Sequence, residues 1–259
     1  NATWAGRLPA SIGIIPIKIT LHELEVFLKE KAKLSSTEFP LGISYETLEI
    51  IHPDLEVEMP QWLILGPRES GKSNFLMNIA SNLLKKDGGI WNIFTISLRR
   101  SPLLNIHSKD QNYHVAGNLE KSVEILTDIN LKLESTMESP NQQYMILLDD
   151  LGSLFEPGME EIVNQINKIL PKVTARRDVH LMATGLLDEL RSQIGSPIVR
   201  MLRQSRTGLV FSKDTSELDW LGVQSIPLEY RKMDLPTGRG FYVSKGRLIL
   251  VQTPIVSKE

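Results

Sequence analysis

One eight-residue segment constrains the fold of this chain more than any other. Residues 66–73 read Gly-Pro-Arg-Glu-Ser-Gly-Lys-Ser and match the pattern G-x-x-x-x-G-K-[ST] at every fixed position. Glycines let such a loop curl, so that successive backbone N–H groups point at one phosphate group at the positive end of the following helix. The segment therefore predicts a phosphate-binding loop between a strand and a helix.

The residues on both sides of the loop support this prediction. The apolar run Trp62–Leu65 precedes it, and apolar residues recur at helical spacing from Phe75 to Leu84. In such sites the lysine, here Lys72, bridges the β- and γ-phosphates, and the next hydroxyl, here Ser73, ligates Mg²⁺. We expect ATP to contact the loop and the first helical residues, namely Gly66, Pro67, Arg68, Glu69, Ser70, Gly71, Lys72, Ser73 and Asn74.

A second segment supplies the acid that a nucleotide site needs. The apolar run Tyr144–Leu148 ends in Asp149 and Asp150. We predict that Asp149 shares the Mg²⁺ ion with Ser73, and that Asp150 orients or deprotonates an attacking water molecule. Because apolar strands often end in an aspartate, the prediction depends on the upstream loop, and for Asp150 a structural role stays open.

From residue 61 onward, short apolar runs alternate with helical patterns. The predicted strands are Trp62–Leu65, Ile90–Ser97, Tyr144–Asp149, Val179–Thr184 and Gly208–Ser212, and the predicted helices are Ser73–Lys86, Leu119–Glu134, Glu160–Ala175 and Leu186–Ser205. This order favours an α/β fold with a mostly parallel central sheet and helices on both faces. Two runs on either side of Lys245-Gly246, Phe241–Val243 and Arg247–Val251, predict a closing C-terminal hairpin.

The first 60 residues have a different texture. Prolines separate short apolar pieces around one helical pattern, from His22 to about Leu34, and Ile43–Ile51 and Leu55–Val57 resemble short strands. A segment of this kind is better suited to wrapping over a domain than to folding alone. We therefore divide the chain into a leader, residues 1–60, that packs on the core, and a core, residues 61–259, that holds the loop.

Composition excludes several classes of protein. The 29 Lys and Arg residues nearly balance 31 Asp and Glu residues, and the net charge of −2 argues against a general polyanion binder while leaving room for a local basic patch. Without cysteine, the chain forms no disulfide, zinc–thiolate site, iron–sulfur cluster or thiol nucleophile. No run of 18 apolar residues predicts a membrane span. Residues 1–4 lack the features of a signal peptide, and we expect a segment of a longer protein.

Beyond the loop, several segments resemble FtsK/SpoIIIE-type P-loop ATPases, and most closely the ATPase modules of the type VII secretion motors EssC and EccC. The loop itself is generic to many NTPases. The narrower resemblance spans residues 8–255 and is carried by the leader Leu8–Pro16, the piece Phe39-Pro40-Leu41-Gly42-Ile43, the strand end Leu147–Leu151, the segment Ala175–Thr184 with its Ala-Arg-Arg start, and the ending Leu235–Val243 with Leu250-Val251-Gln252.

This resemblance implies a RecA-like P-loop NTPase fold with an N-terminal extension and a C-terminal hairpin, and it fits a C-terminal module best. In that family, two or three ATPase modules share one membrane-anchored chain, bind or hydrolyse ATP with Mg²⁺, assemble as rings and engage secreted proteins that carry C-terminal signals. The implied partners are adjacent modules of the same chain and secreted substrates, in a ring or hexamer. The implied location is cytoplasmic, with the anchor outside this chain and no stable nucleic-acid partner.

Two pairs of residues depart from the family pattern. Active members have Thr or Gly where this chain has Arg68 and Glu69, which places bulky, opposite charges on the loop. They have Asp-Glu where this chain has Asp149-Asp150. Because aspartate is one methylene shorter than glutamate, Asp150 reaches less far toward a water molecule that must attack in line. These changes favour intact nucleotide binding with slow hydrolysis.

The position after the fourth predicted strand is a further departure. Many relatives place a sensor Gln there, whereas this chain has Gly185. Thr184 either acts as a weak sensor through its hydroxyl or merely ends the strand. The candidate catalytic residues are Lys72, Asp149, Asp150 and Thr184.

A basic segment follows, in which no acid occurs after Arg191 and before Asp214. Arg200, Arg203 and Arg206 recur every three residues and share one side of a predicted helix. Three explanations stay open: a solvated face, a contact with a neighbouring subunit or its nucleotide, and a DNA contact. The five histidines have no metal-ligand spacing, and we expect structural or solvent-facing roles for them.

Three functions remain in view. The first is an ATP-binding motor module of a type VII secretion ATPase with low intrinsic ATPase activity. The second is a catalytically degenerate domain of the same motor that recognises substrates or regulates its neighbours. The third is a double-stranded DNA translocase, which only the arginine series supports and the net charge of −2 opposes.

Overall fold

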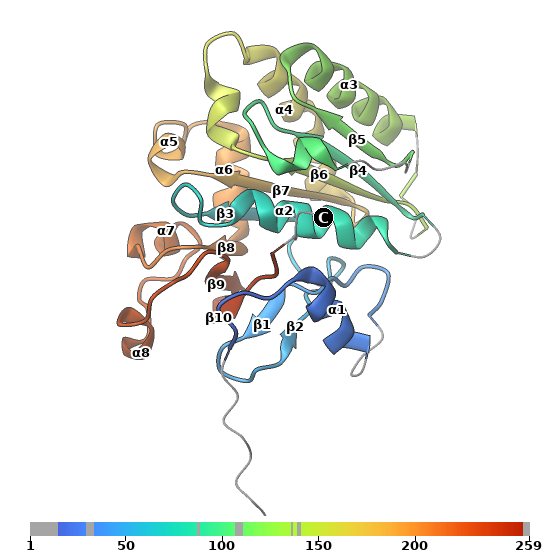
Figure 1. Ribbon diagram of the computed structural model, residues 1–259. Coiled ribbons are helices and arrows are strands. Elements are labelled where there is room, and N and C mark those ends of the chain that lie inside the picture. The colour runs from blue at the N-terminus through green and yellow to red at the C-terminus, as the bar shows by residue number, and fades with distance from the viewer. Residues whose placement is uncertain are drawn as a thin grey trace, which may run out of the picture.

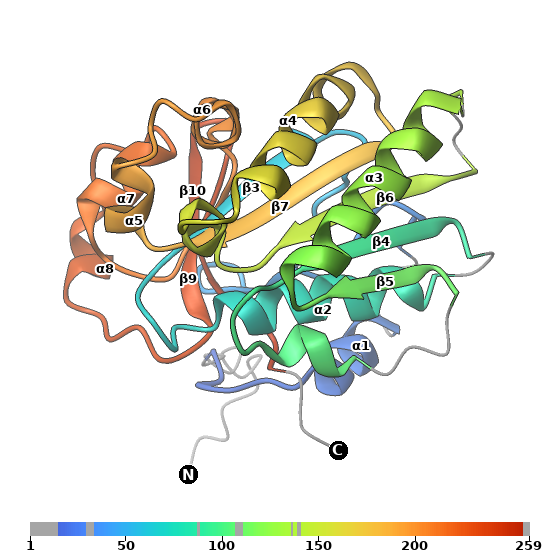
Figure 2. The same ribbon diagram turned by 90° about the horizontal axis from the view of Figure 1, so that it is seen from above.

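The computed structural model describes residues 15–29, 34–86, 89–106, 111–135, 137–138 and 141–255. They form one ten-stranded sheet with helices on both faces (Figure 1, Figure 2). Of its neighbouring strand pairs, five are parallel and four are antiparallel. The prediction of an α/β fold with a mostly parallel central sheet is therefore confirmed.

The parallel part of the sheet carries the strands that the alternating pattern predicts. These strands are β3 (Gln61–Leu65), β4 (Trp91–Ile96), β5 (Tyr113–Ala116), β6 (Gln143–Leu148), β7 (Val179–Gly185) and β8 (Gly208–Val210), in the spatial order β8-β3-β7-β6-β4-β5. The sequence analysis missed β5, because this edge strand is short and mixes polar with apolar residues. Its residues pair with β4 from Ile93 to Ile96.

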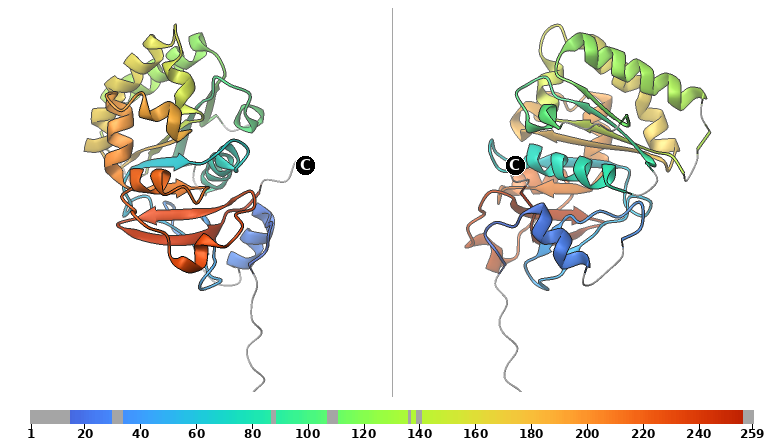
Figure 3. Two further views of the ribbon diagram at one scale, coloured as in Figure 1. Left: turned by 90° about the vertical axis from the view of Figure 1, so that its left-hand side faces the viewer. Right: turned by 45° about the vertical axis from the view of Figure 1, so that its right-hand side comes forward.

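The antiparallel part of the sheet begins with the predicted C-terminal hairpin. Its strands are β9 (Arg239–Ser244) and β10 (Arg247–Gln252). The two turn residues, Lys245 and Gly246, have φ values of 51° and 77°, as a two-residue hairpin turn of the favoured hand requires. Figure 3 shows this hairpin between the parallel strands and the N-terminal elements.

The N-terminal segment extends the sheet beyond the hairpin. Strand β1 (Gly42–Ser44) pairs with β10, and β2 (Ile50–Ile51) pairs with β1. Helix α1 (Leu21–Lys29) begins one residue before the predicted start at His22. Residues 30–33 and most of the segment Leu8–Pro16 lie outside the described residues. The strand predicted at Leu55–Val57 is wrong, because these residues form a turn closed by Asp54. The division at residue 60 stays a prediction.

Two layers of helices cover the sheet. Helix α2 (Lys72–Leu84) lies on one face, and α3 (Leu119–Ser135), α4 (Glu160–Ala175) and α6 (Pro197–Ser205) lie on the other (Figure 2). Strand β3 contributes to both layers: Leu63 and Leu65 pack with the three-helix layer, whereas Trp62 and Ile64 pack with α2. Burial on both faces explains why this strand reads as a continuous apolar run.

The predicted helix Leu186–Ser205 is wrong as a single element. It divides into α5 (Leu187–Arg191) and α6, with a turn over residues 192–196. Pro197 occupies the first position of α6, where its missing N–H group has no helical partner to lose, and proline disfavours helix at the residue before it. Two short helices follow, α7 (Thr215–Trp220) and α8 (Leu228–Arg231). None of the described helices is both long and apolar enough to cross a bilayer.

Candidate functional site

A cleft of about 420 Å³ opens where the parallel strands end. The loop after β3 and the residues after β4, β6 and β7 form its walls, as expected for a ligand site at the carboxyl ends of an open α/β sheet. The predicted site residues that line it are Arg68, Glu69, Lys72, Ser73, Asp149, Asp150 and Thr184. The structure thus brings together residues that lie more than 100 positions apart in the chain.

The loop has the curled backbone that its glycines predict. Gly66 and Gly71 have φ values of 145° and 112°, which L side chains rarely adopt. A Cβ atom at Gly66 would lie 2.8 Å from the Phe211 Cβ, so the loop also packs too closely for a side chain there. The Gly238 N–H group donates a 2.9 Å hydrogen bond to the Ser70 carbonyl. The segment Leu235–Val243 therefore helps to hold the loop in its conformation.

Lys72 lies within the loop and is engaged by it. Its Nζ donates hydrogen bonds to the Gly66 and Pro67 carbonyls, at 2.6 and 2.7 Å. Burial lowers the pKa of Lys72, an effect that nearby carboxylates, with Glu217 the largest, oppose. To reach a phosphate, the ammonium group must exchange these carbonyl contacts for phosphate oxygens.

Asp149 is the centre of a buried hydroxyl cluster. Its Oδ1 accepts hydrogen bonds from the Ser73 and Thr184 hydroxyls, at 2.9 and 2.8 Å. Its Oδ2 accepts one from Ser101 at 2.5 Å and a longer one from Ser97 at 3.5 Å. The side chains that were predicted to share a Mg²⁺ ion therefore already touch, and the carboxylate is held in one orientation.

Asp150 is held differently, by a cation. Its Oδ2 lies 2.7 Å from Arg99 Nη1, and Arg99 also pairs with Glu156 at 2.6 Å. Burial raises the pKa of Asp150, and Arg99 acts in the opposite direction. The backbone N–H of Asp150 donates to the Thr184 hydroxyl at 2.8 Å. Thr184 therefore bridges the two aspartates, whichever of its two predicted roles applies.

Several site residues were missed by the sequence analysis. Ser97, Ser101 and Arg99 follow β4, and Glu189 lies on α5 with its Oε2 buried and without a hydrogen-bond partner among the described residues. Glu217, on α7, is buried, and burial raises its pKa. The residues after β4 could have been predicted, because the predicted strand Ile90–Ser97 ends at the carboxyl edge of the sheet, where ligand sites of open α/β folds lie.

The residues present fit a nucleotide with its metal ion. The Ser70 hydroxyl is buried in the loop and has no partner among the described residues, so it offers a hydrogen bond to a phosphate oxygen. A hydroxyl and a carboxylate, from Ser73 and Asp149, are the oxygen ligands that Mg²⁺ prefers. Of the predicted ATP contacts, Gly66, Pro67, Ser70, Gly71 and Asn74 do not line the cleft. The Asn74 side-chain amide instead donates to the Pro254 carbonyl at 2.8 Å.

The remaining candidates lie outside the cleft. Arg176 forms a paired contact with the buried Asp178, with N–O distances of 2.9 and 2.7 Å, which supports a structural role. His180 is buried in β7, and His107 lies outside the described residues. Arg200, Arg203 and Arg206 line a separate pocket.

Comparison with known proteins agrees with this fold. No family model matches the chain. A curated relative, the ESX secretion system protein EccC of Thermomonospora curvata, is 21% identical over 260 residues, which cover 93% of this chain and 18% of that protein. A solved structure of Thermomonospora curvata EccC (ATPases 2 and 3), in complex with a signal sequence peptide, matches with a TM-score of 0.73 and 19% identity, over 98% of this chain and 46% of that one. EssC (ATPases 2 and 3) from Geobacillus thermodenitrificans matches with a TM-score of 0.73 and 17% identity, over 94% and 46%.

These likenesses confirm the resemblance to EccC and EssC ATPase modules and with it the P-loop ATPase fold. The chain spans less than a fifth of the curated relative and slightly under half of the two solved chains. At these identities the structural matches establish the fold, and the activity of the chain must be argued from its own site.

Proposed function

We propose that this chain is an ATP-binding motor module of a type VII protein secretion ATPase, which hydrolyses ATP slowly or only within an assembled ring. One observation carries the proposal. The curled loop presents Lys72 and Ser73 to a cleft in which Ser73 already contacts Asp149 at 2.9 Å, on a fold shared with EccC and EssC.

In this proposal each site residue has a stated task. The loop amides and the Ser70 hydroxyl would hold the phosphates, and Lys72 would pair with the β- and γ-phosphate oxygens. Ser73 and Asp149 would hold Mg²⁺, which neutralises charge on the phosphates when bound. Thr184 keeps Asp149 and Asp150 in register through its hydrogen bonds to both.

Slow hydrolysis follows from the surroundings of Asp150. Its carboxylate is the candidate that would accept a proton from the attacking water, but Arg99 occupies it at 2.7 Å. A cation at that distance stabilises the charged carboxylate and so weakens it as a base. The shorter reach of aspartate acts in the same direction.

The proposed partners follow from the relatives. One solved EccC structure contains ATPases 2 and 3 in complex with a signal sequence peptide. We extend this to secreted substrates with C-terminal signals, to adjacent ATPase modules and to a ring or hexamer of the full-length motor. In that setting the chain would be a cytoplasmic domain of a membrane-anchored protein.

The proposal is tested by titrating the chain with Mg²⁺-ATP and measuring phosphate release. We expect binding with slow turnover, and we expect Lys72→Ala to weaken binding about 100-fold, since the ammonium pairs with two phosphates. Lys85→Ala is the matched control, because Lys85 directly follows the same helix and pairs with Glu25 away from the cleft. Absence of Mg²⁺-ATP binding, or equal binding by Lys72→Ala, would contradict the proposal.

A catalytically degenerate, regulatory module is the alternative, and the Arg99–Asp150 pair is the observation that favours it. It predicts nucleotide binding without turnover, even in the assembled motor. It also predicts that a substrate's C-terminal peptide binds equally well with and without ATP. Titrating ATP and such a peptide against each other separates the two functions.

A further inference from the structure

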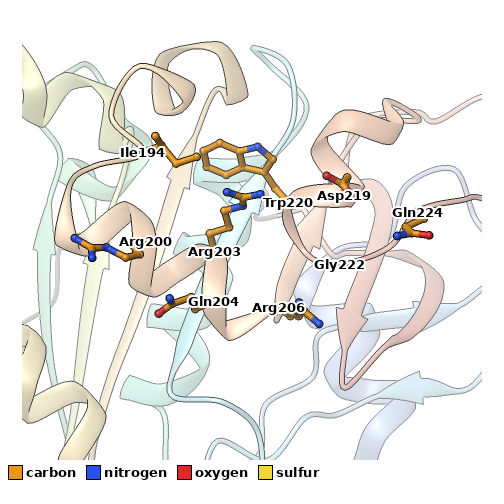
Figure 4. Close-up of a pocket in the computed structure, with 9 residues that line it drawn as sticks. All are labelled: Ile194, Arg200, Arg203, Gln204, Arg206, Asp219, Trp220, Gly222 and Gln224. Atoms are coloured by element: carbon orange, nitrogen blue, oxygen red, sulfur yellow. The ribbon is translucent and has the colours of Figure 1, made fainter.

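A second pocket, of about 680 Å³, lies between α6 and the end of α7 (Figure 4). We call it the arginine groove and define it by Arg200, Arg203, Gln204, Arg206, Trp220 and Gln224. It shares no lining residue with the nucleotide cleft. The three arginines, which the sequence analysis predicts on one side of a helix, therefore line one concave surface.

The positive charges in the arginine groove are not neutralised by the chain. Among the described residues, no carboxylate lies within 4.0 Å of the guanidinium groups of Arg200, Arg203 or Arg206. Arg200 donates one 3.3 Å hydrogen bond to a backbone carbonyl, and Arg203 stacks on the Trp220 ring at 5.4 Å. Asp219 is the one acid among the lining residues. Three guanidinium groups in a concave site attract anions and can bind carboxylates through paired hydrogen bonds.

The backbone around the groove favours a ligand that carries N–H donors as well as negative charge over a bare phosphate. Both helices present their carboxyl ends here: Arg200 to Arg206 cover the second half of α6 and its C-cap, and Trp220 is the last residue of α7. Phosphate sites commonly use the amide ends of helices, where the partial charge is positive. At carboxyl ends, a ligand that carries N–H donors is better matched than a phosphate, which has none.

The polar side chains in the groove match a peptide backbone. Gln204 and Gln224 are exposed, and neither side-chain amide has a hydrogen-bond partner among the described residues. A primary amide donates and accepts, as a peptide group does. Ile194, which also lines the pocket and is 48% exposed, offers an apolar contact.

Charges outside the groove argue against a long nucleic acid. Outside the groove, the exposed acids Asp214 and Glu229 lie next to α7 and on α8, among exposed basic residues, so the surface beyond the groove is of mixed charge. A duplex would bring phosphates beyond the groove and against these carboxylates. We propose that the arginine groove binds a short, extended acidic peptide segment of a partner protein, with carboxylates on the arginines and an apolar side chain against Ile194.

The test uses the whole chain and a synthetic probe, the acetylated and amidated peptide Ser-Glu-Leu-Asp-Glu-Leu-Glu-Ser. Isothermal titration should show binding at least tenfold tighter than to the same peptide with Gln and Asn in place of its acids, and weaker binding at higher salt. Arg200→Gln should weaken binding about tenfold, since one charge-assisted pair is lost. Arg191→Gln is the matched control, because Arg191 is an exposed arginine on α5 that pairs with Asp188 outside the groove.

Arg200 is the preferred position because its side chain makes only one long contact with the chain, whereas Arg203 packs on Trp220. Melting temperatures of both variants verify that the fold is intact. Three results would each overturn the proposal: no binding of the acidic peptide, equal binding of the neutral peptide, or arginine-dependent binding of a 20-base-pair DNA duplex that exceeds that of the peptide. Because peptide binding in the groove does not require nucleotide in the cleft, the Lys72→Ala variant should bind the peptide with the affinity of the unaltered chain.

Discussion

The nucleotide cleft and the arginine groove hold their charges in opposite ways. In the cleft, Lys72 donates to loop carbonyls, Asp149 accepts from hydroxyls, and Asp150 pairs with Arg99. In the groove, the three arginines have no carboxylate partner among the described residues. A ligand in the cleft must therefore displace ion pairs and short hydrogen bonds, whereas a ligand in the groove displaces no ion pair of the three arginines and competes mainly with solvent.

The difference suits the nucleotide cleft to regulation, whereas the arginine groove can bind an anionic ligand without first losing an ion pair. The free energy of binding in the cleft is the difference between the contacts that form and the contacts that are displaced. Small changes in the surrounding residues can therefore shift the affinity of the cleft for its ligand. Helix α7 lies between the two sites. It carries Glu217, whose negative charge raises the pKa of Lys72 against the effect of burial. Three residues later it carries Trp220, which lines the groove. The following predictions test whether the two sites nevertheless behave independently.

Asp149→Ala should have the largest effect, because it removes the proposed carboxylate ligand of Mg²⁺ and the acceptor shared by four hydroxyls. We expect the Mg²⁺-dependent part of ATP affinity to fall about 100-fold, while binding of the acidic peptide in the groove is unchanged. ATP titrations with and without Mg²⁺ measure the effect. Asp188→Ala is the control, since Asp188 is an almost fully exposed aspartate on α5. Retained Mg²⁺ dependence in Asp149→Ala would show that the metal is held elsewhere.

The next effect concerns the pH range in which the two sites can be compared. His180 is buried in β7, and burial lowers its pKa to about 4. The unfolded chain, with an ordinary histidine pKa near 6.5, therefore binds more protons between about pH 6.5 and 4, and stability falls as the pH falls through this window. The slope approaches about 1.4 kcal/mol per pH unit only below the unfolded pKa, so lowering the pH from 6.5 to 5 should cost about 1.5 kcal/mol.

Urea unfolding of His180→Asn at these two pH values tests this prediction. The variant should lose most of the pH dependence, whatever its absolute stability. His22→Asn, at an exposed position of α1, should keep it. An unchanged slope in His180→Asn would assign the acid sensitivity to other groups. The acidic peptide is best titrated above this window, because its own carboxylates protonate near pH 4.

Arg99→Gln tests the pairing in the cleft directly. Removing the cation lets the pKa of Asp150 rise further above its ordinary value, and the carboxylate becomes a stronger base. We expect the turnover number to rise about tenfold and the acid limb of its pH profile to move to higher pH. Arg100→Gln is the control, since Arg100 lines the same cleft but has no ion pair within 4.0 Å among the described residues. A fall in turnover would instead place Arg99 on the phosphates.

Local patterns were sufficient to predict most of the fold. The loop, the strand Trp62–Leu65 and the hairpin around Lys245-Gly246 each combine a turn signal with apolar runs, which need no knowledge of distant residues. Strand β5 exists because it pairs with β4, and nothing in its own residues indicates that. The break between α5 and α6 was accessible, since Gly195 and Pro197 interrupt the helical pattern.

The site was predictable where one motif holds several residues, and not where topology assembles them. Lys72 and Ser73 come from one loop, and Asp149 from the one strand that ends in acids. Ser97, Arg99 and Ser101 reach Asp149 and Asp150 because β4 pairs with β6, with Ile96 opposite Leu148. The strand order that brings them together depends on many long-range contacts, which the pattern of a single strand does not contain.

The smallest effect is expected at Glu69, which combines features of both sites. Glu69 lines the cleft and has no ion pair among the described residues. Its φ of 61° is energetically costly for any residue other than glycine. A solvent-exposed charge several ångströms from a phosphate contributes roughly 0.5 kcal/mol of repulsion, so Glu69→Gln should raise ATP affinity about twofold. Glu69→Gly removes the same charge and also relaxes the loop, so the difference between the two variants isolates the backbone. If both variants bind ATP as the unaltered chain does, Glu69 points away from the bound phosphates, and its charge then has no part in slowing the module.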